Sequence, residues 1–140
     1  IEQKYEYNNK PNRRNQMALT QAEAIQTLTI HMGQADGDYS EQEMMALIRN
    51  NPVAMKHLDN VDHDLYMLKI KKGEATKDAA IQTLKDRSLD TQLDALAIVW
   101  HVLLADGIMD DGEQELMVEL LTEFDIDIES VTSRLKKITS

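Results

Sequence analysis

The residues of this sequence best suited to chemistry are carboxylates gathered in two short segments. The candidate metal ligands among them are Asp36, Asp38, Asp106, Asp110 and Asp111. Calcium and magnesium are bound by sets of oxygen ligands, and zinc also accepts carboxylates. The two segments therefore predict binding of a divalent cation, with calcium, magnesium and zinc as the candidates.

Helix capping is the alternative role for these carboxylates. In the first turn of a helix, a carboxylate accepts hydrogen bonds from unpaired backbone N–H groups and lies at the positive end of the helix dipole. This explains Glu41, Asp111 and Glu113 without a metal. Asp36 and Asp106 differ, because each is expected to end a helix, where the dipole disfavours an anion. Either a cation or the N-terminus of the following helix would compensate them, and the sequence leaves both open.

The histidines suggest an enzyme hypothesis and a simpler structural one. Helical phosphohydrolases of the HD type hold a water-activating metal with a His, a His-Asp pair and an Asp, in that order. The same order is found in His31, His63, Asp64 and Asp106. A buried or half-buried packing role is more typical of His31 and of His101, which is related to it by a repeat. The chain has no cysteine, which excludes thiolate catalysis. We therefore expect a non-enzymatic protein without catalytic residues.

An internal repeat positions the two acidic segments. Residues 31–43 align with residues 101–113 without a gap, at an offset of 70 (106 minus 36). The two windows share a His, an Ala, an Asp-Gly pair and a Glu at equivalent positions. Each window predicts a helix, an Asp-Gly elbow and a second, capped helix. We expect these two units to pack against each other around a pseudo-two-fold axis, because two copies are too few for a solenoid.

Helical periodicity extends over most of the chain. Thr20 with Glu23, and Ser40 with Glu43, have the spacing of capping boxes. The most apolar helix is expected from residue 90 or 91 up to Gly107, and a helix that is apolar nearly all round should be central. No strand-like alternation of useful length is found. The fold class is therefore all-α, a compact bundle of about seven helices.

Composition limits the organisation and the partners of the chain. Residues 1–17 are polar and largely basic, and we expect them to form an arm before a single helical domain at residues 18–140. The formal net charge of −10 and the pI of about 4.7 make nucleic acid an unsuitable partner. The longest apolar stretch, residues 95–105, is too short for a transmembrane helix, which needs roughly 20 apolar residues. The lysines between residues 69 and 87 predict a solvated helix face or, alternatively, a basic surface for a membrane-proximal or acidic partner.

The two elbows resemble those of tellurite-resistance TerB-like domains. The first half of such domains is similar to the Ala-Asp-Gly, Ser-Glu and Asn-Asn-Pro motifs at residues 35–37, 40–41 and 50–52. The second half is similar to the Ala-Asp-Gly, Asp-Asp-Gly-Glu and Phe-Asp-Ile-Asp motifs at residues 105–107, 110–113 and 124–127. Gly112 departs from the more acidic run of the family. The N-terminal domain of a membrane-anchored DnaJ-like co-chaperone has similar elbows.

This resemblance implies a compact all-α domain with a role in tellurite resistance and stress response. It also implies divalent-cation binding and protein partners at the membrane. The absence of cysteine is compatible with the cytoplasm, so we expect a cytoplasmic location, close to the membrane through these partners. We thus expect a non-enzymatic binding module that binds a cation at its Asp-Gly elbows and docks partner proteins. A protein–protein scaffold without a metal is the second hypothesis, and an HD-type metal phosphohydrolase is the third.

Overall fold

The computed structural model of this chain describes residues 18–35, 39–105 and 111–140, and its regular structure there is entirely helical. The eight helices in these ranges are α1 (Gln21–Gly33), α2 (Glu41–Arg49), α3 (Pro52–Leu58), α4 (His63–Lys71), α5 (Lys77–Lys85), α6 (Leu89–Ala105), α7 (Asp111–Phe124) and α8 (Ile128–Thr139). The predicted all-α class is confirmed, with eight helices in place of about seven. No helix within the described ranges is both long and apolar enough to cross a membrane.

The starts of α1 and α2 confirm the two predicted capping boxes. Thr20 Oγ1 accepts from the backbone N–H of Glu23 at 3.1 Å, and Glu23 Oε1 accepts from the N–H of Thr20 at 2.9 Å. Ser40 and Glu43 repeat this exchange at 3.1 and 2.7 Å. These bonds satisfy N–H groups that the start of a helix leaves unpaired. Hydrogen bonds from the backbone and side chain of Ser40 also lower the pKa of Glu43, because they favour its ionised form.

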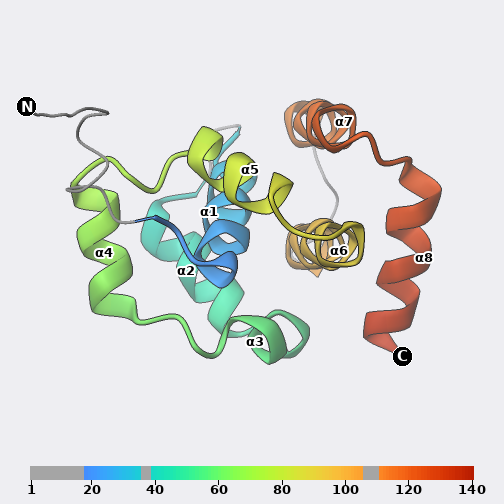
Figure 1. Ribbon diagram of the computed structural model, residues 1–140. Helices are drawn as coiled ribbons and strands as arrows, with labels where there is room; N and C mark the ends of the chain where they lie inside the picture. Colours follow the sequence, from blue (N-terminus) through green and yellow to red (C-terminus); the bar gives the residue numbers. More distant parts are fainter. Residues whose placement is uncertain (1–17, 36–38, 106–110) are drawn as a thin grey trace, which may run out of the picture.

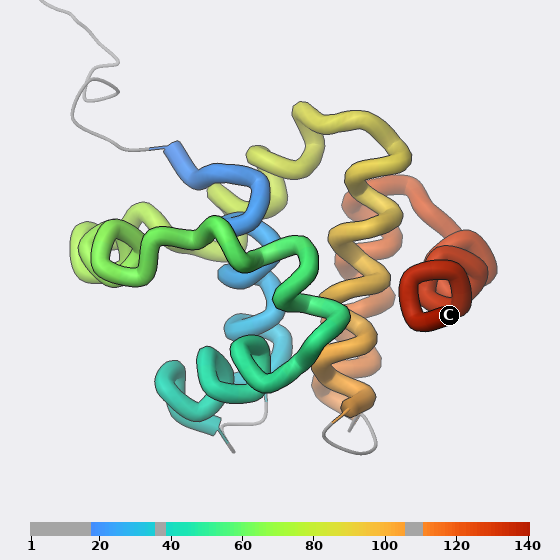
Figure 2. The backbone as a smooth tube through the Cα atoms, turned by 90° about the horizontal axis from the view of Figure 1, so that it is seen from below, coloured from blue at the N-terminus to red at the C-terminus, as the bar shows by residue number. Residues whose placement is uncertain are grey.

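Two helices, α1 and α6, form the centre of the molecule. Residues 22–30 of α1 and residues 95–99 of α6 are all buried, so other helices must surround both. Helix α1 packs on α2, α3, α5, α6 and α7, whereas α6 packs on α1, α3, α5 and α8. Figure 1 shows α6 between α1 and α8. In Figure 2, α1 and α6 lie side by side and run in the same direction, so both finish at the same end of the molecule.

The predicted repeat holds in these central helices and changes in the helices that follow them. Leu28 of α1 and Ile98 of α6 are equivalent at the offset of 70, and both are 0% exposed. In α2, Ile48 is buried, whereas the equivalent Val118 of α7 is 61% exposed and Met117 is buried in its place. The buried faces of α2 and α7 are therefore rotated relative to each other by about one residue, or about 100°. The two units are therefore alike in the burial of their central helices, whereas α2 and α7 bury different faces.

The end of α1 and the start of α6 differ from the predicted ones by one to three residues. Helix α1 ends at Gly33, where an added Cβ would collide with the side chain of Met44, so α1 and α2 approach closely. Helix α6 begins at Leu89, and the hydroxyl of Ser88 accepts from the N–H of Thr91 at 3.2 Å. Both Asp-Gly pairs of the predicted elbows, including Gly107 at the expected end of α6, lie outside the described residues.

Replacing the capping hydroxyls should destabilise the fold. Thr20→Ala and Ser40→Ala should each lower the free energy of unfolding by about 0.5–2 kcal/mol, because a backbone N–H loses its acceptor. Thr132→Ala, the same kind of change inside α8, should be neutral or slightly stabilising, because alanine has the higher helix propensity. If urea denaturation gave the same change in the free energy of unfolding for all three variants, the capping assignment would be contradicted.

Candidate functional site

The predicted cation site falls mainly on residues outside the described part of the chain. Of the five candidate ligands the structure describes Asp111, the exposed first residue of α7. Asp36, Asp38, Asp106 and Asp110 lie in the two undescribed elbows. Within the described residues, no group of three or more His, Asp or Glu side chains could hold a metal ion.

Hydrogen bonds of Gln34 organise the residues that flank the first elbow. At the end of α1, the backbone N–H of Gln34 donates to the carbonyl of Ile30 at 3.1 Å. The side-chain amide of Gln34 donates to the carbonyl of Tyr39 at 3.3 Å and joins the chain before the first elbow to the chain after it. Because α1 and α6 are parallel (Figure 2), Ala35 and Ala105, which precede the two elbows, lie at the same end of the molecule.

The two histidines related by the repeat have different environments. His31 is exposed, so its predicted packing role is wrong. His101 is half-buried, as predicted, and its Nδ1 lies 3.0 Å from Nδ2 and 3.2 Å from Oδ1 of Asn51. Asn51 Oδ1 also caps α3 by accepting from the N–H of Ala54 at 3.0 Å. His101 of the second unit therefore supports the α2–α3 turn of the first, a contact that sequence reasoning missed.

The HD-type arrangement gains no support from the described residues. His63 is the exposed first residue of α4, and its Nδ1 lies 3.3 Å from a guanidinium nitrogen of Arg49. His31, His63 and Asp64 do not belong to any candidate metal group in the part of the chain that the structure describes. Asp106, the fourth residue of the proposed set, lies outside it.

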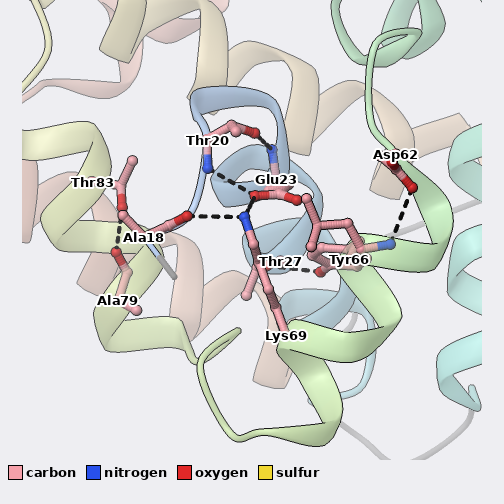
Figure 3. A network of polar contacts seen from close by, with 10 residues as sticks. Ala18, Thr20, Glu23, Thr27, Asp62, Tyr66, Lys69, Ala79 and Thr83 are labelled. Carbon is pink, nitrogen blue, oxygen red and sulfur yellow. Dashed lines mark hydrogen bonds and ion pairs between the residues drawn. The ribbon is translucent and has the colours of Figure 1, made fainter. Parts of the chain in front are cut away.

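The lysine-rich segment contains a buried ion pair that the sequence did not reveal. Lys69 Nζ donates to Glu23 Oε1 at 2.6 Å and to the carbonyl of Ala18 at 2.9 Å. Figure 3 shows the ammonium group pointing into the start of α1 between these two acceptors. The side chains of Lys69 and Glu23 are 4% and 2% exposed, and buried charges of this kind need a partner. The predicted solvated face is therefore wrong for Lys69, although the neighbouring Lys71 and Lys72 are exposed.

Tyr66 adds a second polar contact between α4 and α1. Its hydroxyl lies 2.7 Å from Thr27 Oγ1, and its side chain is 1% exposed (Figure 3). Burial raises the pKa of Tyr66 to about 12, although the hydrogen bond with Thr27 acts in the opposite direction. Tyr66 and Lys69 are three residues apart on α4, and their partners Glu23 and Thr27 are four apart on α1, so each pair lies on one helix face. These two contacts hold α4, at the edge of the molecule in Figure 1, against the central helix α1.

A groove of about 170 Å³ lies between α5 and α7. Its floor is apolar and includes Met32 of α1, Ile81 of α5 and Leu120 of α7, all of which are largely buried. Both α5 and α7 pack on α1, which explains why α1 contributes to the floor. The groove is smaller than the roughly 300–1,000 Å³ typical of sites for small molecules and cofactors. It is better suited to one or two side chains of a polypeptide.

The rims of this α5–α7 groove are charged. Lys77 and Asp78 line the α5 side, and Glu119 and Glu123 line the α7 side. Lys85 Nζ donates to Glu123 Oε1 at 2.7 Å and joins the two helices. This hydrogen bond and the charge of Lys85 lower the pKa of Glu123. Glu119 has no such ion pair among the described residues, so its charge is available to a ligand.

The fold defines an all-α domain in which two related helical units share a central pair of parallel helices. Comparison with family models assigns that domain: residues 22–135 match the family "Tellurite resistance protein TerB". The match covers far more than half of the chain and includes both units, so the chain belongs to the TerB family, as the elbow motifs predicted. Neither the search of curated proteins nor the search of solved structures gave a match.

The buried ion pair yields a direct stability test. Lys69→Met should cost about 3–5 kcal/mol of unfolding free energy, because it leaves the carboxylate of Glu23 buried without its cation. The double variant Glu23→Gln with Lys69→Met should recover most of this loss, because no charge then remains buried. Lys71→Met, which changes an exposed lysine two residues away, should stay within about 0.5 kcal/mol of the parent. Equal effects of Lys69→Met and Lys71→Met in chemical denaturation would contradict the assignment.

Proposed function

We propose that this TerB-family chain is a non-enzymatic binding module that binds a divalent cation at its two Asp-Gly elbows and docks partner proteins. Calcium, magnesium and zinc are the candidate ions, and Asp36, Asp38, Asp106, Asp110 and Asp111 are the candidate ligands. The proposed setting is tellurite resistance and stress response, in the cytoplasm close to the membrane through protein partners. The observation that carries the proposal is the parallel arrangement of α1 and α6 (Figure 2).

This arrangement favours a cation for an electrostatic reason. The carbonyl end of a helix carries a partial negative charge, and α1 and α6 present their carbonyl ends at the same end of the molecule. The last turn of α6 contains no basic residue, and His31 is the basic residue in the last turn of α1. The acidic elbows follow directly in the sequence, so a cation there would compensate both helix ends and the carboxylates.

The uneven charge of the surface supports docking of partner proteins. Helix α7 has exposed carboxylates at Asp111, Glu115 and Glu119 and contains no lysine or arginine. Helix α4, by contrast, ends with the exposed Lys71 and Lys72. Two surfaces of opposite charge favour oriented association with charged partners.

A metal-dependent melting experiment tests the cation proposal. A bound cation stabilises the folded state by mass action, by about 2.7 kcal/mol when its concentration is 100 times Kd. Titration with calcium, magnesium or zinc should therefore raise the melting temperature of the parent chain. Asp36→Asn and Asp106→Asn should abolish this rise and change the metal-free melting temperature little. Asp86→Asn is the matched control, because Asp86 is an exposed residue at the end of α5, away from the elbows.

The opposite pattern would favour the second hypothesis, a scaffold without a metal. In that case no cation changes the melting temperature, and Asp36→Asn and Asp106→Asn lower it in the absence of metal because the carboxylates cap neighbouring helices. A metal response that survives both substitutions would place the ion elsewhere and would also contradict the proposal.

A further inference from the structure

The α5–α7 groove offers a site that the cation proposal does not use. Its apolar floor at Met32, Ile81 and Leu120 lies beneath rims that carry three carboxylates and one lysine. One of these carboxylates, Glu123, is paired with Lys85, whereas Glu119 has no ion pair within the described residues. A side chain with a long aliphatic stem and a cationic head fits this combination, because the stem covers apolar surface while the head meets a carboxylate.

We propose that the α5–α7 groove is occupied by the chain's own N-terminal segment, residues 1–17, through Lys4 or Lys10 of that segment. The segment has four basic residues and two acidic ones, whereas the chain as a whole has a net charge of −10. Its basic residues are Lys4, Lys10, Arg13 and Arg14. Opposite charges on the segment and on the α7 rim of the groove bring the two together.

The length of the segment allows this contact within one molecule. The described chain begins at Ala18, whose carbonyl is held by Lys69 at the start of α1. Met32, on the groove floor, lies near the other end of α1, a helix of 13 residues that is about 20 Å long. Lys10 precedes Ala18 by eight residues, which reach up to about 27 Å when extended. Lys10 and the residues before it can therefore extend as far along α1 as the groove within the same molecule.

Paramagnetic relaxation in the full-length chain tests the contact. The chain has no cysteine, so a nitroxide on Asn12→Cys labels the segment at one position. We expect the label to broaden the backbone amide signals of Ile81, Leu116 and Leu120, which line the groove. Glu119→Arg should remove this broadening, because it reverses the charge of the available rim carboxylate.

Glu115→Arg is the matched control, because it makes the same charge change at an exposed site of α7 that does not line the groove. The broadening should persist in this variant, and core amide shifts should show that both variants remain folded. The proposal is overturned if the groove amides are not broadened, or if Glu115→Arg removes the broadening as fully as Glu119→Arg. It is also overturned if the broadening occurs only between chains, in a mixture of nitroxide-labelled chain and isotope-labelled chain.

Discussion

The packing of α1 against α6 is the constraint on which the rest of this structure depends. Helix α1 is buried over most of its length and α6 over its middle, so both depend on neighbours on several sides. Equivalent residues of the repeat, such as Leu28 and Ile98, both belong to this shared core. Because the helices are parallel, their ends also define one end of the molecule, where both acidic elbows follow. A duplicated sequence thus brings the last residues of two similar helices to the same end of the molecule.

The remaining helices are attached to this pair by different kinds of interaction. Helix α4 is held by a buried ion pair and by a hydrogen bond between two hydroxyl groups. Both need a specific geometry, and removing one partner leaves a buried polar group unpaired, which destabilises the fold. Arg134 of α8 binds the carboxylates of Asp90 and Asp94 of α6, each at 2.6 Å. Helices α5 and α7 both rest on α1 and are linked to each other by the Lys85–Glu123 pair, which leaves the groove between them. These attachments close the core on most sides and leave charged surfaces exposed.

Local features of this fold were predictable from the sequence, and contacts between distant residues were not. The capping boxes of Thr20 and Ser40 involve residues three positions apart, so their chemistry is visible in the sequence itself. Lys69 and Glu23 are 46 residues apart, and the burial of Lys69 depends on how α4 lies on α1. His31 and His101 are equivalent in the repeat, but only His101 has Asn51 beside it. The predicted ligand set extends over elbows of which the structure describes Asp111 alone, so it stays a prediction.

The parallel arrangement of α1 and α6 is the central claim, and distances between pairs of spin labels measure it most directly. Ala35, Leu89 and Ala105 are exposed, and the chain has no cysteine that would compete for the label. Helix α6 has 17 residues and is about 25 Å long, so labels at its two ends are well separated. The structure predicts a shorter distance for Ala35→Cys with Ala105→Cys than for Ala35→Cys with Leu89→Cys. The reverse order would show that α1 and α6 are antiparallel, and it would place the two elbows at opposite ends of the molecule.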